Sequence, residues 1–100
     1  MNISSNGTTL HASDVQELNA TNVAAFRDQI RSALQTQHTQ LDLDLSKTRF
    51  LDSSGLGALI SIHKTLCSRQ GVVRIVNPTP QVQQILELTR MHRIFEIVRH

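Results

Sequence analysis

The chain has 100 residues, which suits a single domain with a modest core, and it has no run of about 18 apolar residues that could cross a membrane. Its formal net charge is only +2, its basic residues are scattered, it contains no Tyr or Trp, and its three phenylalanines are expected in the core, which together argue against nucleic-acid binding. One cysteine cannot form an internal disulfide, and the N-terminus has no secretory pattern, so we expect a cytoplasmic protein.

The first 20 residues carry the weakest secondary-structure pattern in the chain. Gly7 predicts a turn, and short strands are expected at Thr8–His11 and Asp14–Leu18. Beyond them, apolar residues recur at helical spacing after a short polar residue that can accept a backbone N–H. This pattern predicts a helix that begins at a cap near Asn22 and runs to about Gln37.

The segment Leu41–Leu45 alternates strictly between leucine and aspartate, which is typical of a strand with one buried and one polar face. Asp42 and Asp44 point the same way on such a strand and raise the alternative of a metal pair. No further ligand group is evident in the sequence, so we favour an exposed sheet face and predict no metal site and no cofactor. Clean alternation also predicts helices mainly on one face of the sheet.

The second half of the chain alternates helix and strand. A helix is expected from Leu56 until Gly71, which suits the position just after a helix, and a β-branched strand at Val72–Val76 follows. Together with the preceding strand this forms a βαβ unit with parallel strands. Thr79 and Pro80 then suit the start of a third helix, and a last strand is expected at residues 94–98. The fold class is therefore α/β, with a mixed sheet of about four to five strands.

The orientation of the helix after Leu56 decides which of its side chains are exposed. One apolar stripe, on which we expect a partly buried histidine and a buried thiol, consists of Leu56, Leu59, Ile60, His63 and Cys67. If this stripe faces the core, then Ser54, Ala58, Ile62 and Thr65 lie on the opposite side. Ile62 is then either an ordinary exposed isoleucine or the apolar centre of a docking surface, and Ile62→Glu is expected to weaken partner binding without harming the fold.

The hexapeptide Asp52–Gly57 reads DSSGLG and stands where this helix begins. Its aspartate or a serine can cap the helix, but two glycines in the first turn each cost roughly 1 kcal/mol relative to alanine. Close packing explains such glycines, and so does room for the backbone of a partner. Enzyme patterns fit poorly, because the G-x-S-x-G, Walker and dinucleotide-loop motifs are all incomplete. A small enzyme with Ser53 or Ser54 as its nucleophile remains a third alternative.

A serine that is itself a substrate fits the hexapeptide better. A phosphate at a helix N-terminus meets free N–H groups and the positive end of the helix dipole. It also adds nearly two negative charges to an exposed surface, where Asp52 is already acidic. A partner docked over the serines, Gly55 and Gly57 would then be expelled by charge and bulk.

The hexapeptide, together with the elements around it, resembles the phosphorylation motif of STAS domains, most closely that of bacterial anti-sigma factor antagonists. The resemblance extends over about residues 41–98, and it implies a single STAS-like domain spanning residues 1–100. It also implies that Ser53 is the phosphoacceptor, with Ser54 as second choice. The partner-binding surface expected from the motif and the helix orientation consists of Asp52, Ser53, Ser54, Gly55, Gly57, Ala58 and Ile62.

The family also implies a mechanism and partners. The unphosphorylated protein binds an anti-sigma factor that is also a serine kinase, and so releases a sigma factor. Phosphorylation abolishes binding, and a metal-dependent serine phosphatase resets the cycle, so the chain itself is no enzyme. The alternative is a STAS scaffold or transporter-associated subunit that is not phosphorylated. Two departures from the family are the indistinct strands at residues 1–19 and the end at His100, where many members continue into another short helix.

Overall fold

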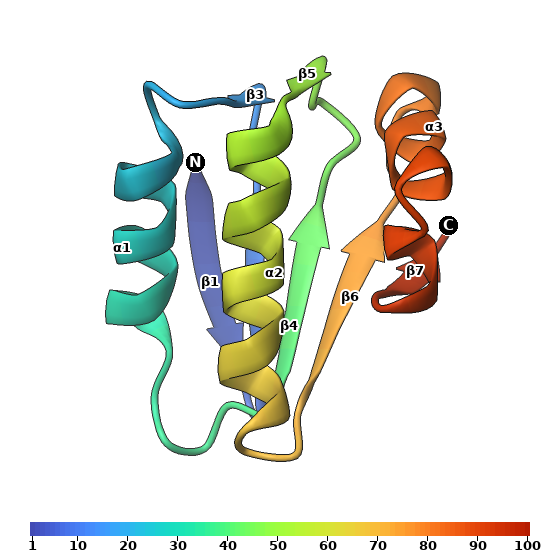
Figure 1. The fold of residues 1–100 in the computed structure, drawn as a ribbon. Coiled ribbons are helices and arrows are strands. Elements are labelled where there is room, and N and C mark those ends of the chain that lie inside the picture. Colours follow the sequence, from blue (N-terminus) through green and yellow to red (C-terminus); the bar gives the residue numbers. More distant parts are fainter.

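The computed structural model describes residues 1–100 and shows a five-stranded mixed sheet with its helices on one face (Figure 1). The strand order is β1-β2-β4-β6-β7, with β1 antiparallel to β2 and every other pair parallel. A separate two-stranded ribbon of β3 and β5 lies beyond the carboxyl ends of β4 and β6. The predicted fold class is confirmed. In chain order, the elements are β1 (Asn2–Asn6), β2 (Thr9–Ser13), β3 (Glu17–Leu18), α1 (Val23–Ala33), β4 (Gln40–Asp44), β5 (Phe50–Leu51), α2 (Ser53–Cys67), β6 (Val72–Val76), α3 (Pro80–Leu88), the 3-10 helix η1 (Met91–Arg93) and β7 (Glu96–Val98).

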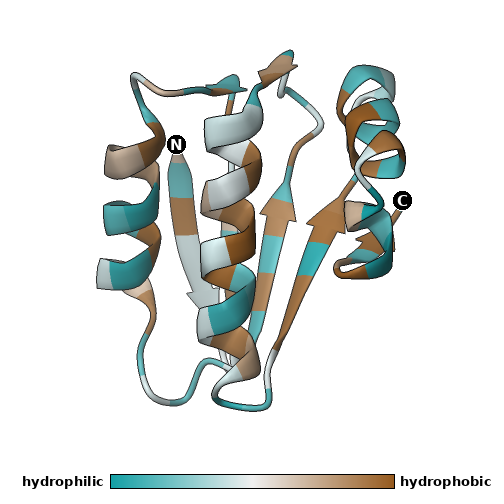
Figure 2. Ribbon diagram, viewed as in Figure 1, coloured by the Kyte–Doolittle hydropathy of each residue, from teal (hydrophilic) through white to brown (hydrophobic).

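The two faces of the sheet differ as the alternation in β4 predicts. Its leucines are fully buried under the helices, and the colouring in Figure 2 alternates along the strands. On the open face, the Asp42 carboxylate lies 3.7 Å from His11 Nδ1 and 3.7 Å from Arg74 Nε, so its charge is matched by neighbouring strands. Asp44 instead accepts a hydrogen bond from the backbone two residues further on. The contacts of both aspartates are therefore those of residues on the open face of a sheet.

None of the chain's helices has the length and apolar character to cross a membrane.

Several element boundaries differ from those expected. The strand β1 was not predicted, because its NISSN sequence is polar and exposed, and it is held by antiparallel pairing with β2 around the turn at Gly7. The helix α1 begins after Asn22 as predicted but ends at Ala33, about one turn early. The last strand begins only at Glu96, because the N–H groups of Ile94 and Phe95 donate back to Met91 O in the turn that closes η1. These differences add β1, β5 and η1 to the expected elements and leave the order of the others unchanged.

Gly71 was expected directly after α2, in the position where glycine often has a left-handed backbone, but the helix ends at Cys67. The left-handed residue is Gln70, with a φ of 58°, whereas Gly71 is not in that region. A β-carbon on Gly71 would lie 2.5 Å from the carbonyl oxygen of Thr39, and the Gly71 N–H donates to Leu66 O at 2.7 Å. The glycine is needed because two chain segments cross closely there.

The helix α2 is rotated relative to the expected orientation. The side chains that it buries against the sheet belong to Ala58, Leu59, Ile62 and Leu66, while Gly55 is buried at its start. Ile62 is only 1% exposed, and Leu56 is merely half-buried. The predicted exposure of Ala58 and Ile62 is therefore wrong, as is the predicted burial of Cys67, whose side chain is exposed. Because α2 is apolar on two adjacent stripes, its sequence does not distinguish which one meets the sheet.

We predict that Ile62→Glu unfolds the domain or destabilises it by more than about 3 kcal/mol, because it would place a carboxylate with no partner in the core. Urea unfolding monitored by circular dichroism measures the loss. Lys64→Glu, at an exposed position on the same helix, is the matched control and should cost little. A folded Ile62→Glu protein with near-native stability would contradict the orientation of α2.

Candidate functional site

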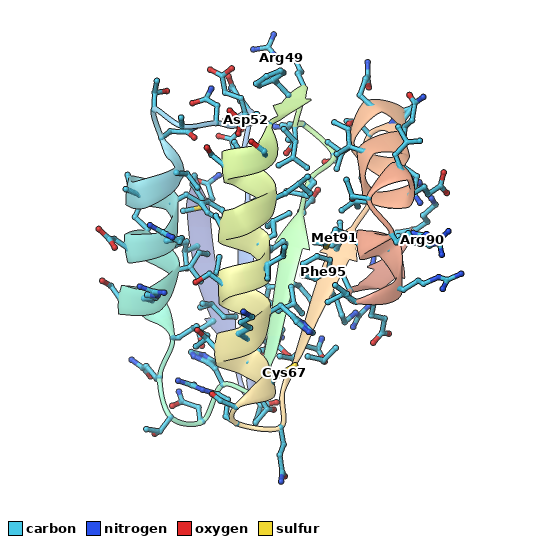
Figure 3. All side chains as sticks on the ribbon, viewed as in Figure 1. Arg49, Asp52, Cys67, Arg90, Met91 and Phe95 are labelled. Carbon is cyan, nitrogen blue, oxygen red and sulfur yellow. The ribbon has the colours of Figure 1, made fainter.

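The candidate site is built on the ribbon of β3 and β5. The Arg49 N–H donates to Gln16 O at 2.8 Å, and the Asp52 N–H donates to Leu18 O at 3.1 Å. These bonds flank the parallel pairing of the two short strands. They bring the start of α2 against a segment more than thirty residues earlier, at the end of the molecule where Figure 3 labels Arg49 and Asp52.

Thr48 connects this ribbon to the rest of the fold through two hydrogen bonds. Its buried hydroxyl donates to Val15 O, and its own carbonyl accepts a hydrogen bond of 2.8 Å from Thr79 Oγ1. The same Thr79 oxygen accepts the Val82 N–H at 3.3 Å, and Pro80 is the first residue of α3, so the predicted helix start is confirmed. The N-terminus of α3 is thereby tied to the loop that precedes the hexapeptide.

Asp52 is the N-cap of α2. Its Oδ1 accepts the Gly55 N–H at 2.9 Å, and its Oδ2 accepts the Ala20 N–H at 3.3 Å. One side chain therefore caps the helix and also holds the loop before α1. The backbone N–H groups of Ser53 and Ser54 have no partner within the protein and remain available at the positive end of the helix.

The two glycines of the hexapeptide have different reasons to be glycine. A β-carbon at Gly55 would lie 2.6 Å from Leu18 O and 2.6 Å from Leu51 Cδ1, so no side chain fits there. A β-carbon at Gly57 would have no neighbour within 4 Å, and Gly57 is exposed. Packing therefore explains Gly55 but not Gly57, whose missing side chain leaves the second turn of α2 bare.

The structure brings part of the predicted surface together. Ser53 and Gly57 are exposed one helical turn apart, and Ser54 is half-buried beside them. Asp52 and Gly55 are engaged in capping and packing, while Ala58 and Ile62 lie in the core and drop out of the surface.

One residue beside this site, Phe50, was expected in the core together with the other phenylalanines, and this expectation is wrong. Phe50 is 51% exposed, whereas its neighbour Leu51 is buried. A two-residue strand is too short to show alternation, so the sequence pattern carried no signal for its orientation.

Catalytic alternatives find no support in the geometry. Neither serine hydroxyl is hydrogen-bonded to a histidine or a carboxylate, as an activated nucleophile would be. At the other end of α2, Cys67 Sγ lies 3.3 Å from His63 Nε2 and 3.8 Å from Nδ1. Such similar distances to both nitrogens place the sulfur beside the ring rather than in line with either lone pair. The chain also has no group of three or more His, Cys, Asp and Glu side chains that could hold a metal ion.

The fold and the capped hexapeptide define a small α/β domain whose distinctive surface is the start of α2. The sequence profile of the STAS domain matches residues 8–100, and the chain belongs to this family.

Known relatives agree with this assignment. A Thermotoga maritima protein named "Putative anti-sigma factor antagonist" is 31% identical over 83 residues, which cover 82% of this chain and 74% of that protein. A crystal structure with the same description, also from Thermotoga maritima, has a TM-score of 0.89 at 26% identity and covers 97% of this chain and 84% of that one. The Bacillus anti-sigma factor antagonist SpoIIAA in its unphosphorylated form shares the fold, with a TM-score of 0.81 at 20% identity over 96% of this chain and 85% of that one.

We predict opposite effects of alanine at the two glycines. Gly55→Ala should destabilise the domain by about 1–3 kcal/mol, because its methyl group would collide with the backbone of β3. Gly57→Ala should stabilise it by about 0.5–1 kcal/mol, because alanine favours the helix and meets no neighbour. Urea unfolding of both variants beside the wild type tests this, and equal effects of the same sign would contradict it.

Proposed function

We propose that this STAS domain is an anti-sigma factor antagonist whose binding is switched off by phosphorylation of Ser53. Relatives with that name support the antagonist role. In its unphosphorylated form the protein would bind an anti-sigma factor with serine kinase activity and so release a sigma factor. A metal-dependent serine phosphatase would return the phosphorylated form to the binding state, and the chain itself would catalyse nothing.

The observation that carries this proposal is that only some residues of the hexapeptide are needed for the fold. Asp52 and Gly55 have structural tasks that account for them, whereas Ser53 and Gly57 are exposed and make no contact that the fold requires. An exposed serine beside a bare helical turn gives a kinase access to the hydroxyl and lets a partner approach the helix backbone at Gly57.

Phosphorylation at Ser53 would change this surface strongly without a change of fold. A phosphoserine carries a charge of about −1.5 to −2 at pH 7, and the free N–H groups of the first turn favour an anion there. The phosphate would stand at the N-terminus of α2 beside Asp52, one helical turn from the bare position at Gly57. A partner in close contact with this turn would collide with the phosphate and would meet its negative charge without a matching positive charge. Ser54, which is half-buried, is the second-choice site.

Replacement of the serine should separate the two forms of the switch. Ser53→Ala is expected to keep binding and escape phosphorylation, while Ser53→Asp is expected to fold normally and bind the anti-sigma factor at least about tenfold more weakly, a loss of 1.4 kcal/mol. Calorimetric titration with each purified anti-sigma factor of the source organism measures affinity, and phosphopeptide mapping of the native protein locates the phosphate. Ser54→Ala is the matched control for the loss of a hydroxyl.

The results of these experiments distinguish the phosphorylation switch from the alternative roles. A phosphate on Ser54 would keep the switch and move its site. A protein that carries no phosphate under any growth condition, and whose affinity is unchanged in Ser53→Asp, would contradict the switch and favour a scaffold or transporter-associated role.

A further inference from the structure

We infer that Phe50 is the apolar anchor of the partner-binding surface and inserts into an apolar pocket on the partner protein. This inference rests on the proposed function. The chain has three phenylalanines, of which Phe26 and Phe95 are 5% and 4% exposed and belong to the core, whereas Phe50 is 51% exposed. Aromatic side chains that are exposed beside a binding site and buried on association commonly dominate the binding energy.

The backbone that carries Phe50 is held in place before any partner arrives. Parallel pairing with Glu17 and the hydrogen bond from the Arg49 N–H to Gln16 O fix the chain on one side of Phe50. On the other side, Leu51 is buried in the core. A phenylalanine has few rotamers to lose, so a partner that buries it on this rigid ribbon sacrifices little conformational entropy.

Phe50 adjoins the proposed switch and complements it in shape. It stands three residues before Ser53, on the ribbon from which α2 starts, so the surface combines a projecting ring with the bare turn at Gly57. A partner that fits both needs a concave apolar pocket next to a segment able to approach a helix backbone. These are properties of a protein surface.

Charges around the ring do not favour a partner of one sign. Lys47 and Arg49 are exposed near Phe50, but so is Glu17 on the paired strand, and Asp52 caps the adjacent helix. None of these four residues takes part in an ion pair. The apolar ring, rather than net charge, therefore supplies the attraction, and binding should depend only weakly on salt.

The other large apolar side chains that are exposed are Met1, Leu88 and Ile94, and the last two provide an internal comparison. Leu88, the last residue of α3, is 76% exposed, and Ile94, which follows η1, is 40% exposed. The opposite end of α3 lies nearer the ribbon, because its N-cap Thr79 donates to the Thr48 carbonyl just before β5 (Figure 1). Leu88 is thus more exposed than Phe50 and lies outside the inferred surface.

The test compares Phe50→Ala with Leu88→Ala, using as probes the purified anti-sigma factors of the source organism. Phe50→Ala is expected to weaken binding by tenfold or more, while Leu88→Ala and the wild type agree within about twofold. Both positions are exposed, so both variants should fold, and circular dichroism with urea unfolding confirms this before affinity is measured. Phe50→Leu should recover part of the lost affinity, because leucine keeps an apolar side chain for the pocket.

Measurement of Ser53→Asp with the same partner separates this inference from the proposed function. If Ser53→Asp loses binding while Phe50→Ala stays within twofold of the wild type, the anchor is wrong and the switch stands. If Phe50→Ala loses binding while Ser53→Asp does not, the anchor stands and the switch is wrong. If no anti-sigma factor binds the wild type more tightly than about 100 μM, both are overturned.

Discussion

The close approach of α2 to the carbonyl of Leu18 determines how the end of the domain that carries the hexapeptide is arranged. A side chain at Gly55 would collide with that carbonyl and with Leu51, so only glycine lets the first turn of the helix rest on the ribbon. Once the turn is seated there, Asp52 reaches both the helix N–H and the loop before α1. The hydroxyl of Ser53 is left facing solvent as a consequence of this packing.

The hexapeptide thus contains two kinds of residue, those that the fold requires and those that it does not, and the sequence motif does not distinguish them. Asp52 and Gly55 maintain the fold, and their replacement would act on any function through stability. Ser53 and Gly57 make no contact that the fold requires, so a change at either residue alters the exposed surface without disturbing the packing of the fold. A regulatory site benefits from this separation, because a covalent change at an unengaged side chain leaves the scaffold intact.

The open face of the sheet shows how a pattern of charged residues is explained without a ligand. Asp42 lies between His11 and Arg74 on neighbouring strands, and Asp44 accepts a backbone hydrogen bond. These contacts account for the alternating aspartates that would otherwise suggest a metal pair.

The sequence alone determined the order of the three helices and of the strands β2, β4 and β6, the polar sheet face and the place of the hexapeptide, because alternation, caps and glycines are local signals. It could not determine the rotation of α2, since Leu56 and Ile62 belong to adjacent apolar stripes and only the sheet selects one of them. Nor could it show that packing requires glycine at position 55 but not at position 57, or that Phe50 is exposed. Those properties depend on which distant segment lies against each residue, and only the tertiary structure decides that.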